Sequence, residues 1–420
     1  MFNALESSYL PLDYIMIPSQ IILAFVAIYF FVLGISGLVQ FRTPSLYKPQ
    51  KRFSVIVPAH NEELVIGPLI DNLTALNYPK ELYDVFVIAD NCNDSTADIA
   101  REHGALVYER TNIEQKGKGY ALEWFFAKLY NSPKKYDAVV IFDADNLVHS
   151  DFLKHMNNRL CEGAKIVQGY IDAKNPQDTW VTASFAMSFW VANRMLQKAR
   201  YNLGLSNYLG GTGMVISLDV LRQIGWGATS LTEDLEFSLK ALLNGYKTTW
   251  AHEAIVYDEK PLTFKQAWKQ RKRWARGHVE LFRTYTFRLI KEAIRKRSIV
   301  LLDSTMLAIQ PLLVVFMGLF TIIGFVDLFI ADIYTPIFKY IWPPLVWELV
   351  SVLQLIYPFL VMWMDHLPRK VIKWMFLHFP VFVYSWVPIV FLCFFGSTRV
   401  SWSHTLHTRS ISYADINRQR

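Results

Sequence analysis

Long apolar runs lie at both ends of this chain, and a polar middle separates them. The first run, residues 14–41, carries no charged side chain and has an almost continuous aliphatic and aromatic core at residues 21–39. About 20 apolar residues are enough to span the hydrocarbon region of a bilayer. A cleaved signal peptide would have a shorter core and a small-residue cleavage site, whereas this run leads into Phe41 and Arg42. The pattern therefore favours a membrane anchor.

Three more apolar segments follow residue 298: residues 304–326, 340–364 and 374–398. Basic residues flank them at 295–297 and 369–373, whereas the connection 331–347 has a single Lys339. Basic residues concentrate in cytoplasmic loops, so this asymmetry predicts that residues 42–297 are cytoplasmic. Four spans would place the basic tail outside. We therefore expect one segment to be interfacial or re-entrant.

The polar middle of the chain alternates between strand-like and helix-like segments. Short β-rich runs at residues 53–57, 85–89 and 138–142 are typical of buried parallel strands. Helical patterns at residues 64–76, 97–102 and 120–130 lie between and around them. Such alternation predicts an open, doubly wound α/β sheet with helices on both faces.

Composition narrows the class of protein. The chain is 52% hydrophobic, 15% aromatic and 19% charged, which is too apolar for an ordinary soluble enzyme and excludes a disordered chain. Its three cysteines, Cys92, Cys161 and Cys393, are odd in number and lack metal-site spacing, which excludes a disulfide scaffold. The mixture indicates a soluble domain inserted between membrane segments.

Polar clusters follow the three predicted strands, at residues 58–62, 90–94 and 143–146. Ligands of open α/β sheets bind beyond the carboxyl ends of the strands, so these clusters point to one shared site. Asp143 and Asp145 flank one residue, and alternation puts both carboxylates on one side, where a hard divalent cation could bridge them to phosphates. An acidic strand-to-loop turn is the alternative. Asp90 and Asp94 could equally form an Asx-turn and a helix cap.

Two glycine-rich stretches and the acidic first turn of one helix supply further candidate site residues. Lys118 lies between two glycines ahead of a helix, where it could neutralise a phosphate or stand in an exposed turn. Residues 210–213, Gly-Gly-Thr-Gly, indicate either backbone packed against a ligand or a tight turn. Thr232 caps the start of a helix with Glu233 and Asp234 in its first turn. Helix capping is a complete structural explanation for these residues. It does not exclude that one of the carboxylates has a raised pKa and acts as a general base.

A strongly basic segment lies between the polar middle and the C-terminal apolar runs. Residues 262–298 hold twelve Lys and Arg but only two acids, Glu280 and Glu292, and the whole chain is only +7. Aromatic and aliphatic residues are interleaved with the charges. A basic helix of this kind suits a membrane interface, and the adjoining spans make that partner a better fit than nucleic acid. The uncharged stretch 180–193 is too short to span and is also expected at the interface.

Taken in order, these features resemble the membrane-embedded family 2 glycosyltransferases, which include cellulose, chitin, hyaluronan and poly-N-acetylglucosamine synthases. The resemblance covers about residues 50–280. It is carried by residues 58–62, Asp90, Asp143-x-Asp145, Gly211-Thr212-Gly213, Thr232-Glu233-Asp234 and Gln270-x-x-Arg273-Trp274. Ala89-Asp90 departs from the two aspartates of many members. A single clear N-terminal span, where several relatives have two or more, leaves the topology open.

The resemblance implies a GT-A fold in the cytosolic domain and a nucleotide-sugar donor, most often a UDP-sugar. The donor-binding residues would be Glu62, Asp90, Lys118, Asp143 and Arg273. Asp143 and Asp145 would hold Mg²⁺ or Mn²⁺. Asp234, beside Glu233, would be the general base of a single inverting displacement. The acceptor side would consist of Gly211, Thr212, Gly213, Gln270 and Trp274.

The implied function is processive synthesis of a β-linked polysaccharide from UDP-glucose or UDP-N-acetylglucosamine, coupled to its passage across the cell membrane. A partner subunit or a homo-oligomer would then complete the conduit. One alternative is a single transfer to a membrane lipid or polyprenyl phosphate, and another is an inactive nucleotide-sugar-binding assembly protein. The expected domains are an anchor (1–45), the cytosolic GT-A domain (46–260), basic interface helices (261–298), about three transmembrane helices (299–398) and a basic tail (399–420).

Overall fold

The computed structural model describes residues 13–40, 45–327, 329–330, 344–374, 376, 378–396 and 411–419. A mixed sheet in the order β3-β2-β1-β4-β7-β6-β8-β5 forms the centre of the α/β domain. Its strands are β1 (Phe53–Ala59), β2 (Tyr83–Asp90), β3 (Leu106–Arg110), β4 (Ala138–Ile141), β5 (Leu147–Val148), β6 (Ile166–Ala173), β7 (Met214–Ser217) and β8 (Thr248–Asp258). The three strands predicted from the sequence are β1, β2 and β4, and they are confirmed.

The sheet is mixed. Strands β3, β2, β1 and β4 run parallel, as the alternating pattern predicted; β7 is antiparallel to both β4 and β6, β8 is parallel to β6, and β5 is antiparallel to β8. The predicted α/β fold is confirmed, and β7 adds a reversed strand that the sequence analysis did not identify. A four-residue apolar strand such as β7 carries no sequence signal of its direction, because parallel and antiparallel core strands bury the same residue types.

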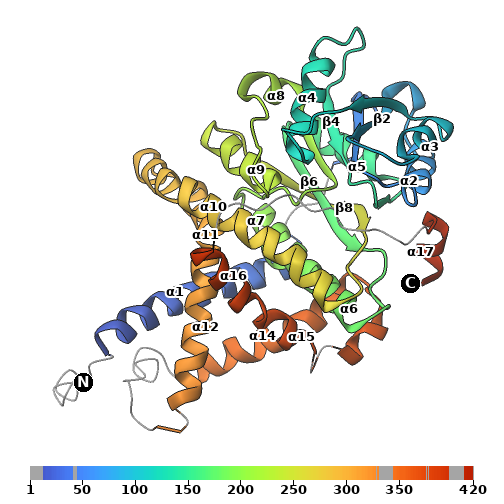
Figure 1. Ribbon diagram of the computed structural model, residues 1–420. Helices are drawn as coiled ribbons and strands as arrows, with labels where there is room; N and C mark the ends of the chain where they lie inside the picture. Colours follow the sequence, from blue (N-terminus) through green and yellow to red (C-terminus); the bar gives the residue numbers. More distant parts are fainter. Residues whose placement is uncertain are drawn as a thin grey trace.

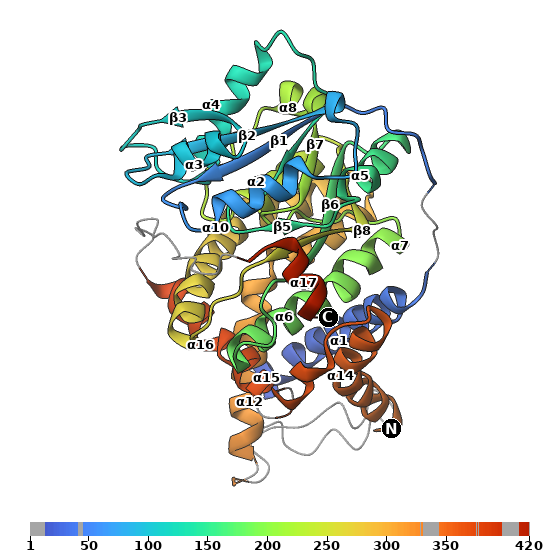
Figure 2. The ribbon, with the colours of Figure 1, turned by 90° about the vertical axis from the view of Figure 1, so that its right-hand side faces the viewer.

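Helices cover both faces of the sheet (Figures 1 and 2). Val55 and Val57 of β1 pack in a cluster with α2 (Ile66–Thr74) and α5 (Phe152–Cys161), whereas Ile56 faces the other cluster. Successive side chains of a strand point to opposite faces, which explains this division. The remaining elements around the sheet are the 3₁₀ turn η2 (Lys80–Leu82), α3 (Thr96–Glu102), α4 (Lys118–Tyr130), α8 (Leu218–Ile224) and α9 (Glu233–Leu243).

The other helices gather beyond one edge of the α/β domain (Figure 1). They are α1 (Asp13–Leu38), α6 (Trp180–Ala192), the π-helix η3 (Asn193–Lys198), α7 (Ala199–Asn202), α10 (Phe264–Lys296), α11 (Ile299–Ala308), α12 (Gln310–Asp327), α14 (Pro344–Met364), the 3₁₀ helix η4 (Arg369–Trp374), α15 (His378–Tyr384) and α16 (Trp386–Phe395). Helix α17 (Tyr413–Gln419) lies apart from them. Buried ion pairs join several of the gathered helices to one another. Arg200 bonds Asp303 of α11, and Arg194 bonds Asp365 just after α14.

By length and apolar composition, two of the described segments qualify as membrane-crossing helices: Asp13–Leu38 and His378–Phe395. A third is conceivable if α11 and the start of α12, bent by 58° at their junction, count as one span. Pro311 explains the break, because it has no amide hydrogen to donate to Leu307. The predicted apolar segments thus correspond to α1, α11–α12, α14 and α15–α16.

The basic segment folds as one long helix, α10. Thr263 and Gln266 form a capping box at its start, with their side chains accepting each other's backbone N–H at 3.3 and 3.1 Å. Helices α15 and α16 lie along α10, because Arg271 donates to the Phe382 carbonyl and Arg283 to the Phe394 carbonyl, both at 2.9 Å. This fourth apolar segment therefore follows the basic helix instead of leaving it.

The C-terminal helix α17 returns to the α/β domain. Ile416 is buried with Leu147 of β5 and Tyr257 of β8. The rings of Tyr257 and Tyr413 lie 6.1 Å apart. Figure 2 shows this helix beside β5 and β8, above the ends of α6 and α1. The tail helix thus packs against the α/β domain.

Candidate active site

A cavity of about 910 Å³ lies beyond the carboxyl ends of β1, β2 and β4 and continues between α10, α12 and α16. Its inner end is polar. Of the predicted site residues, those that line it are Glu62, Asp90, Lys118, Asp143, Gly211, Thr212, Glu233, Asp234, Gln270, Arg273 and Trp274. Asp145 and Gly213 do not line it. Segments from more than 200 residues of sequence therefore meet at one opening, as the strand-end clusters predicted.

Asp90 is held by a charged partner that the sequence pattern did not reveal. Arg110 Nη1 donates to Asp90 Oδ1 at 2.5 Å, and both side chains are nearly fully buried. Asp94 instead accepts from the Thr96 amide, two residues on, at 3.1 Å, which is the Asx-turn considered for this cluster. Of the two acids, Asp90 therefore faces the cavity and Asp94 serves the local fold. Arg110 ends a half-exposed edge strand, so no hydrophobic pattern marked it.

Lys118 connects the glycine-rich turn to the acidic end of the cavity. Gly117 precedes it at φ 115°, a conformation that favours glycine. Lys118 Nζ lies 2.5 Å from Asp143 Oδ1 and 2.6 Å from the Gly211 carbonyl oxygen. Burial opposes its charge, but Asp143, Glu233 and Asp234 outweigh burial and raise the pKa of the ammonium. Lys118 is therefore a fixed cation within an acidic group, and the exposed-turn alternative is wrong.

The two aspartates of the Asp-x-Asp sequence have different surroundings. Asp143 reaches the cavity and pairs with Lys118. Asp145 is only 3% exposed, and its Oδ2 accepts the Glu259 N–H at 3.2 Å. Asp258 lies beside Asp145 and does line the cavity. Burial, followed by the charge of Asp145, raises the pKa of Asp258. The alternation of side chains along an extended strand predicted both carboxylates on the same side. The loop after β4 instead turns the Asp145 side chain away from the cavity.

The Gly211–Gly213 turn connects this acidic loop with α9. Gly211 has φ 87°, and a Cβ added there would lie 3.4 Å from Asp234 Oδ2. Thr212 Oγ1 hydrogen-bonds Asn146 Oδ1 and accepts the Asp143 N–H at 3.3 Å. At Gly213 an added Cβ would meet Val256 Cγ1 at 2.7 Å, so this glycine permits packing against β8. Close backbone approach is real at both glycines, but only the first faces the cavity.

Glu233 and Asp234 begin α9 at the inner wall of the cavity. Burial, reinforced by Asp234, raises the pKa of Glu233 to about 7. Burial also raises the pKa of Asp234, and Lys118 opposes the rise for both residues. Asp234 Oδ1 accepts the Leu235 N–H at 2.8 Å, while its Oδ2 faces Gly211. A carboxyl of raised pKa, held at a helix start and open to a cavity, meets the requirements of a general base.

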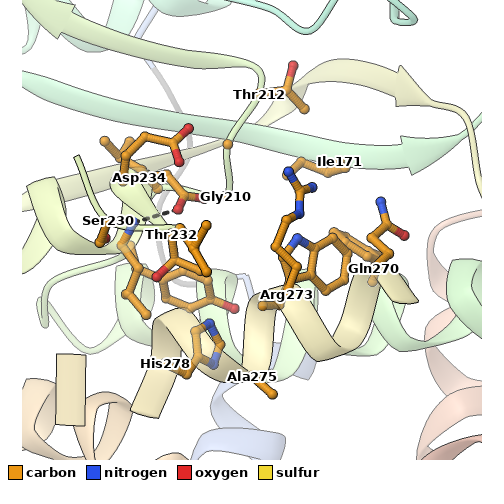
Figure 3. A pocket seen from close by; sticks show the side chains of 18 of the residues that line it. Ile171, Gly210, Thr212, Ser230, Thr232, Asp234, Gln270, Arg273, Ala275 and His278 are labelled. Atoms are coloured by element: carbon orange, nitrogen blue, oxygen red, sulfur yellow. Dashed lines mark hydrogen bonds between the residues drawn. The ribbon is translucent and has the colours of Figure 1, made fainter. Parts of the chain in front are cut away.

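Gln270, Arg273 and Trp274 share one face of α10, because residues three and four apart on a helix are neighbours. Figure 3 shows Arg273 rising from this helix across the opening from Asp234. Within the described part of the chain Arg273 forms no hydrogen bond or ion pair, and the buried Gln270 Oε1 has no partner. The Trp274 ring meets Phe185 edge-on at 5.9 Å. The face thus offers an unpaired guanidinium next to a fixed indole.

His278 lines the same cavity one turn beyond Trp274, and the sequence reasoning missed it. Its ring lies below Thr232 and Asp234 in Figure 3. Burial lowers the pKa of His278 to about 4, so its imidazole is neutral at physiological pH. The spacing Gln270, Trp274, His278 is a repeat of four on one helical face, and this signal could have identified the histidine.

The residues present could hold a divalent cation only if a bound ligand supplied further oxygen atoms to it. No three His, Cys, Asp or Glu side chains among the described residues converge to hold a metal ion by themselves. Mg²⁺ is commonly bound by one or two carboxylates together with substrate phosphates. The oxygen donors of Asp143 and the Asp145–Asp258 pair suit such a shared site. The chemistry of this donor set therefore agrees with a hard cation bound together with a diphosphate.

The outer end of the cavity is apolar. Its lining residues from α11, α12, α15 and α16 are Leu307, Gln310, Pro311, Val314, Met317, Gly318, Phe379, Pro380, Val383, Tyr384, Trp386, Val387 and Val390. None of these described residues is charged. The cavity therefore has two parts: the acidic end at the sheet, and an apolar arm between the C-terminal helices.

Comparison with known proteins agrees with this geometry. The model of a family described as "Glycosyltransferase like family 2" matches residues 49–277, more than half of the chain. A beta-monoglucosyldiacylglycerol synthase from Trichormus variabilis is 30% identical over 63% of this chain and 58% of its own. A poly-beta-1,6-N-acetyl-D-glucosamine synthase from Staphylococcus aureus is 25% identical over 55% of each chain. These alignments span less than two thirds of either relative.

Among solved structures, a mannosyltransferase from Pyrobaculum calidifontis, in complex with GDP-Man and Mn²⁺, superposes with a TM-score of 0.49. The two chains are 17% identical, and the superposition covers 82% of this chain and 94% of that one. Similarity at this level says nothing about the sugar or the acceptor.

Proposed function

This chain belongs to glycosyltransferase family 2 and has the GT-A fold, and on that premise we propose that it transfers a hexosyl group from a nucleotide sugar to an acceptor hydroxyl at the membrane surface. One observation carries the proposal. The Lys118–Asp143 pair, Asp234 and the Arg273–Trp274 face of α10 converge on one cavity. A charged leaving group, a proton acceptor and an acceptor platform are what this reaction needs.

The donor lies across the strand ends in this proposal. Glu62 and Asp90 bind the uridine end, and the ion pair with Arg110 fixes the Asp90 carboxylate. Lys118 and Arg273 stand beside the diphosphate. Arg273 suits this role because it has no partner among the described residues and its planar fork matches phosphate oxygens. The donor would be UDP-glucose or UDP-N-acetylglucosamine.

Asp143, with Asp145, would hold Mg²⁺ or Mn²⁺ against the diphosphate. When bound, the cation would stabilise the negative charge of the departing nucleoside diphosphate. The chain's own cations act on the same charge: Lys118 is already fixed beside Asp143 at 2.5 Å. Preorganised cations of this kind stabilise charge as it develops, without rearranging during the reaction.

The transfer step is a single displacement. The acceptor hydroxyl oxygen attacks the anomeric carbon, and the bond from that carbon to the diphosphate oxygen breaks, with its electron pair leaving on the nucleotide. The hydroxyl proton passes to Asp234, whose raised pKa suits proton acceptance near neutral pH. Attack from the face opposite the leaving group inverts the anomeric centre. Trp274 provides the surface on which the acceptor sugar or headgroup rests.

Two acceptor classes follow from the same chemistry. A growing β-linked glycan, with passage across the membrane and help from a homo-oligomer or export subunits, is the function implied by the sequence. The fixed indole of Trp274 supports it, because sugar rings stack on aromatic faces. A membrane lipid is the second class, and the apolar lining of the cavity's outer arm supports it. Either reading places the chain in the cell membrane with its α/β domain in the cytoplasm.

A donor panel tests the reaction itself. The full chain, purified in detergent, would be incubated with radiolabelled UDP-glucose, UDP-N-acetylglucosamine and GDP-mannose in the presence of Mg²⁺ or Mn²⁺ and total membrane extract. We expect one UDP-sugar to be consumed and its label to appear in a product. Tight nucleotide binding without hydrolysis or transfer from any donor would overturn the proposal and favour an inactive assembly protein.

A further inference from the structure

We propose that the acceptor is a membrane lipid with a neutral, hydroxyl-bearing headgroup, and that its hydrocarbon tail lies in the apolar arm between α12, α15 and α16. This inference rests on the proposed transfer reaction and specifies its acceptor. Three features carry it: the lining of the arm, the exposed apolar rim, and the ionisable residues at the junction between the two ends of the cavity.

The lining of the arm matches hydrocarbon better than sugar. Val314, Met317 and Val387 present only methyl, methylene and thioether groups to the cavity. Of the thirteen lining residues from these C-terminal helices, only Gln310, Tyr384 and Trp386 have a polar side-chain group. A glycan presents hydroxyls on all sides, and burying a hydroxyl without a hydrogen bond is unfavourable. An acyl chain has no polar group to leave unpaired there, so it can pass from the bilayer into the arm without such a cost.

The rim of the arm is exposed and apolar. Met317 of α12 and Val383 of α15 line the cavity and are 56% and 43% exposed. The same helices expose further hydrophobic side chains beyond the rim, at Ile322, Phe325 and Val381. A continuous apolar surface of this kind would be unfavourable in water and marks contact with lipid or protein. The arm is therefore open sideways, where a lipid could enter from the bilayer without leaving it.

Two local features shape the arm. The 58° bend between α11 and α12, at Pro311, turns α12 away from α10 and leaves a space beside Leu307. Farther along α12, Gly318 lies so close to α16 that an added Cβ would meet Val387 Cγ1 at 2.1 Å. This contact joins the two walls beyond the space. The arm is thus a groove that the contact between Gly318 and the Val387 side chain closes at one end, with its open side at Met317.

The junction between arm and acidic end selects the headgroup. Its ionisable residues are Glu233, Asp234 and His278, and burial keeps the His278 imidazole neutral. A phosphate headgroup would bring its charge next to two carboxylates, and the nearby cations Lys118 and Arg273 would already be engaged by the donor diphosphate. A neutral hydroxyl avoids this repulsion and can hydrogen-bond the imidazole. The proton leaves the lipid hydroxyl for Asp234 as the new glycosidic bond forms.

The test fills the arm without touching the catalytic end. Met317→Trp places an indole at the rim, and Leu319→Trp is the matched control, because Leu319 is 44% exposed on the same helix and does not line the cavity. The full chain in phosphatidylcholine vesicles would receive dioleoylglycerol as lipid acceptor and dibutyrylglycerol as the short-chain analogue. A cello-oligosaccharide and undecaprenyl phosphate would serve as competing acceptor classes.

We expect radiolabel to enter dioleoylglycerol. Met317→Trp should raise the KM for dioleoylglycerol at least about tenfold, which corresponds to about 1.4 kcal/mol. It should leave donor hydrolysis and the dibutyrylglycerol reaction unchanged, and Leu319→Trp should behave as wild type. Equal effects of both substitutions, or label only in the oligosaccharide or only in undecaprenyl phosphate, would overturn the inference. In those cases donor turnover would persist, which separates this failure from failure of the transfer reaction itself.

Discussion

Lys118 Nζ lies 2.5 Å from Asp143 Oδ1, although the two residues come from different βα units of the sheet. The same ammonium also acts on Glu233 and Asp234, because its positive charge opposes the rise in pKa of both acids. One cation therefore stands between the proposed phosphate-binding end of the cavity and the proposed base. Substitution of Lys118 should affect donor binding and proton transfer together.

The pH profile gives a first prediction. Burial raises the pKa of Glu233 to about 7 and also raises that of Asp234. The protonated acid cannot accept the acceptor's proton, so kcat/KM should fall as the pH drops, and the fall should lie above the pH range of an ordinary carboxyl. An ordinary carboxyl would place this limb near pH 4. Lys118→Met should move the limb to higher pH because it removes a cation that lowers both pKa values.

Lys118→Arg is the matched control for this profile, since it keeps the charge and should leave the limb in place. Its fork and length differ from the ammonium, so its overall rate need not match wild type. The position of the limb, measured from pH 5 to 9, is the informative quantity. A limb near pH 4 in wild type, or no displacement in Lys118→Met, would contradict the assigned coupling.

Metal dependence gives a second prediction. Asp143→Asn should weaken Mn²⁺ binding in the presence of UDP by at least about tenfold, because a carboxylate is the preferred ligand of a hard cation. Mn²⁺ affinity can be followed by electron paramagnetic resonance without turnover. Asp94→Asn is a suitable control, since Asp94 forms a local turn with the Thr96 amide and does not line the cavity. Equal Mn²⁺ affinity in wild type and Asp143→Asn would refute the ligand assignment.

Trp274 gives a third prediction. Trp274→Ala should raise the KM for the acceptor and slow transfer, while donor hydrolysis in the absence of acceptor stays within about twofold of wild type. Trp274→Phe should restore much of the loss, because an aromatic face remains beside Phe185. Parallel loss of hydrolysis and transfer in Trp274→Ala would mean that the indole supports the fold of α10 instead of the acceptor.

Much of the site could be predicted from the sequence, because its residues follow regular elements. Strand β1 was recognisable as a short aliphatic run, and its carboxyl end leads to Glu62. Asp234 and the Gln270, Arg273 and Trp274 face follow from a helix start and from helical spacing. These features depend on local sequence alone. The roles of individual residues nevertheless stay predictions until they are tested.

Other features depend on contacts between distant segments, and the sequence could not reveal them. Asp145 is turned inward by the Glu259 amide, 114 residues away. Arg110 reaches Asp90 across neighbouring strands, and nothing in its own segment marks that role. The direction of β7 is likewise set by its neighbours. The contact of α16 with the basic helix α10, through Arg283 and the Phe394 carbonyl, is likewise not visible in apolar composition.

Membrane topology gives a fourth prediction. Helix α17 packs on β5 and β8, so the tail should lie on the cytoplasmic side together with the α/β domain. Ser412→Cys, in a variant without the three native cysteines, should react with a membrane-impermeant maleimide only after the cytoplasmic face is made accessible. Labelling of Ser412→Cys from the outside of intact cells would contradict this arrangement and would require another crossing.

The identity of the base is the central claim, and it depends on two adjacent acids. Asp234 Oδ2 faces Gly211 at the cavity, and burial raises the pKa of both Asp234 and Glu233. Asp234→Asn keeps the shape of the side chain and its place at the start of α9, so it isolates proton transfer. Glu233→Gln is the matched variant at the neighbouring position.

The most direct measurement is the transfer rate of Asp234→Asn alongside its affinity for UDP, determined by calorimetry on the same preparation. The account predicts that the transfer rate falls by about 10²–10⁴-fold while the Kd for UDP stays within about twofold, with Glu233→Gln retaining far more activity. Equal loss of UDP binding and transfer in Asp234→Asn, or near-normal transfer, would contradict it.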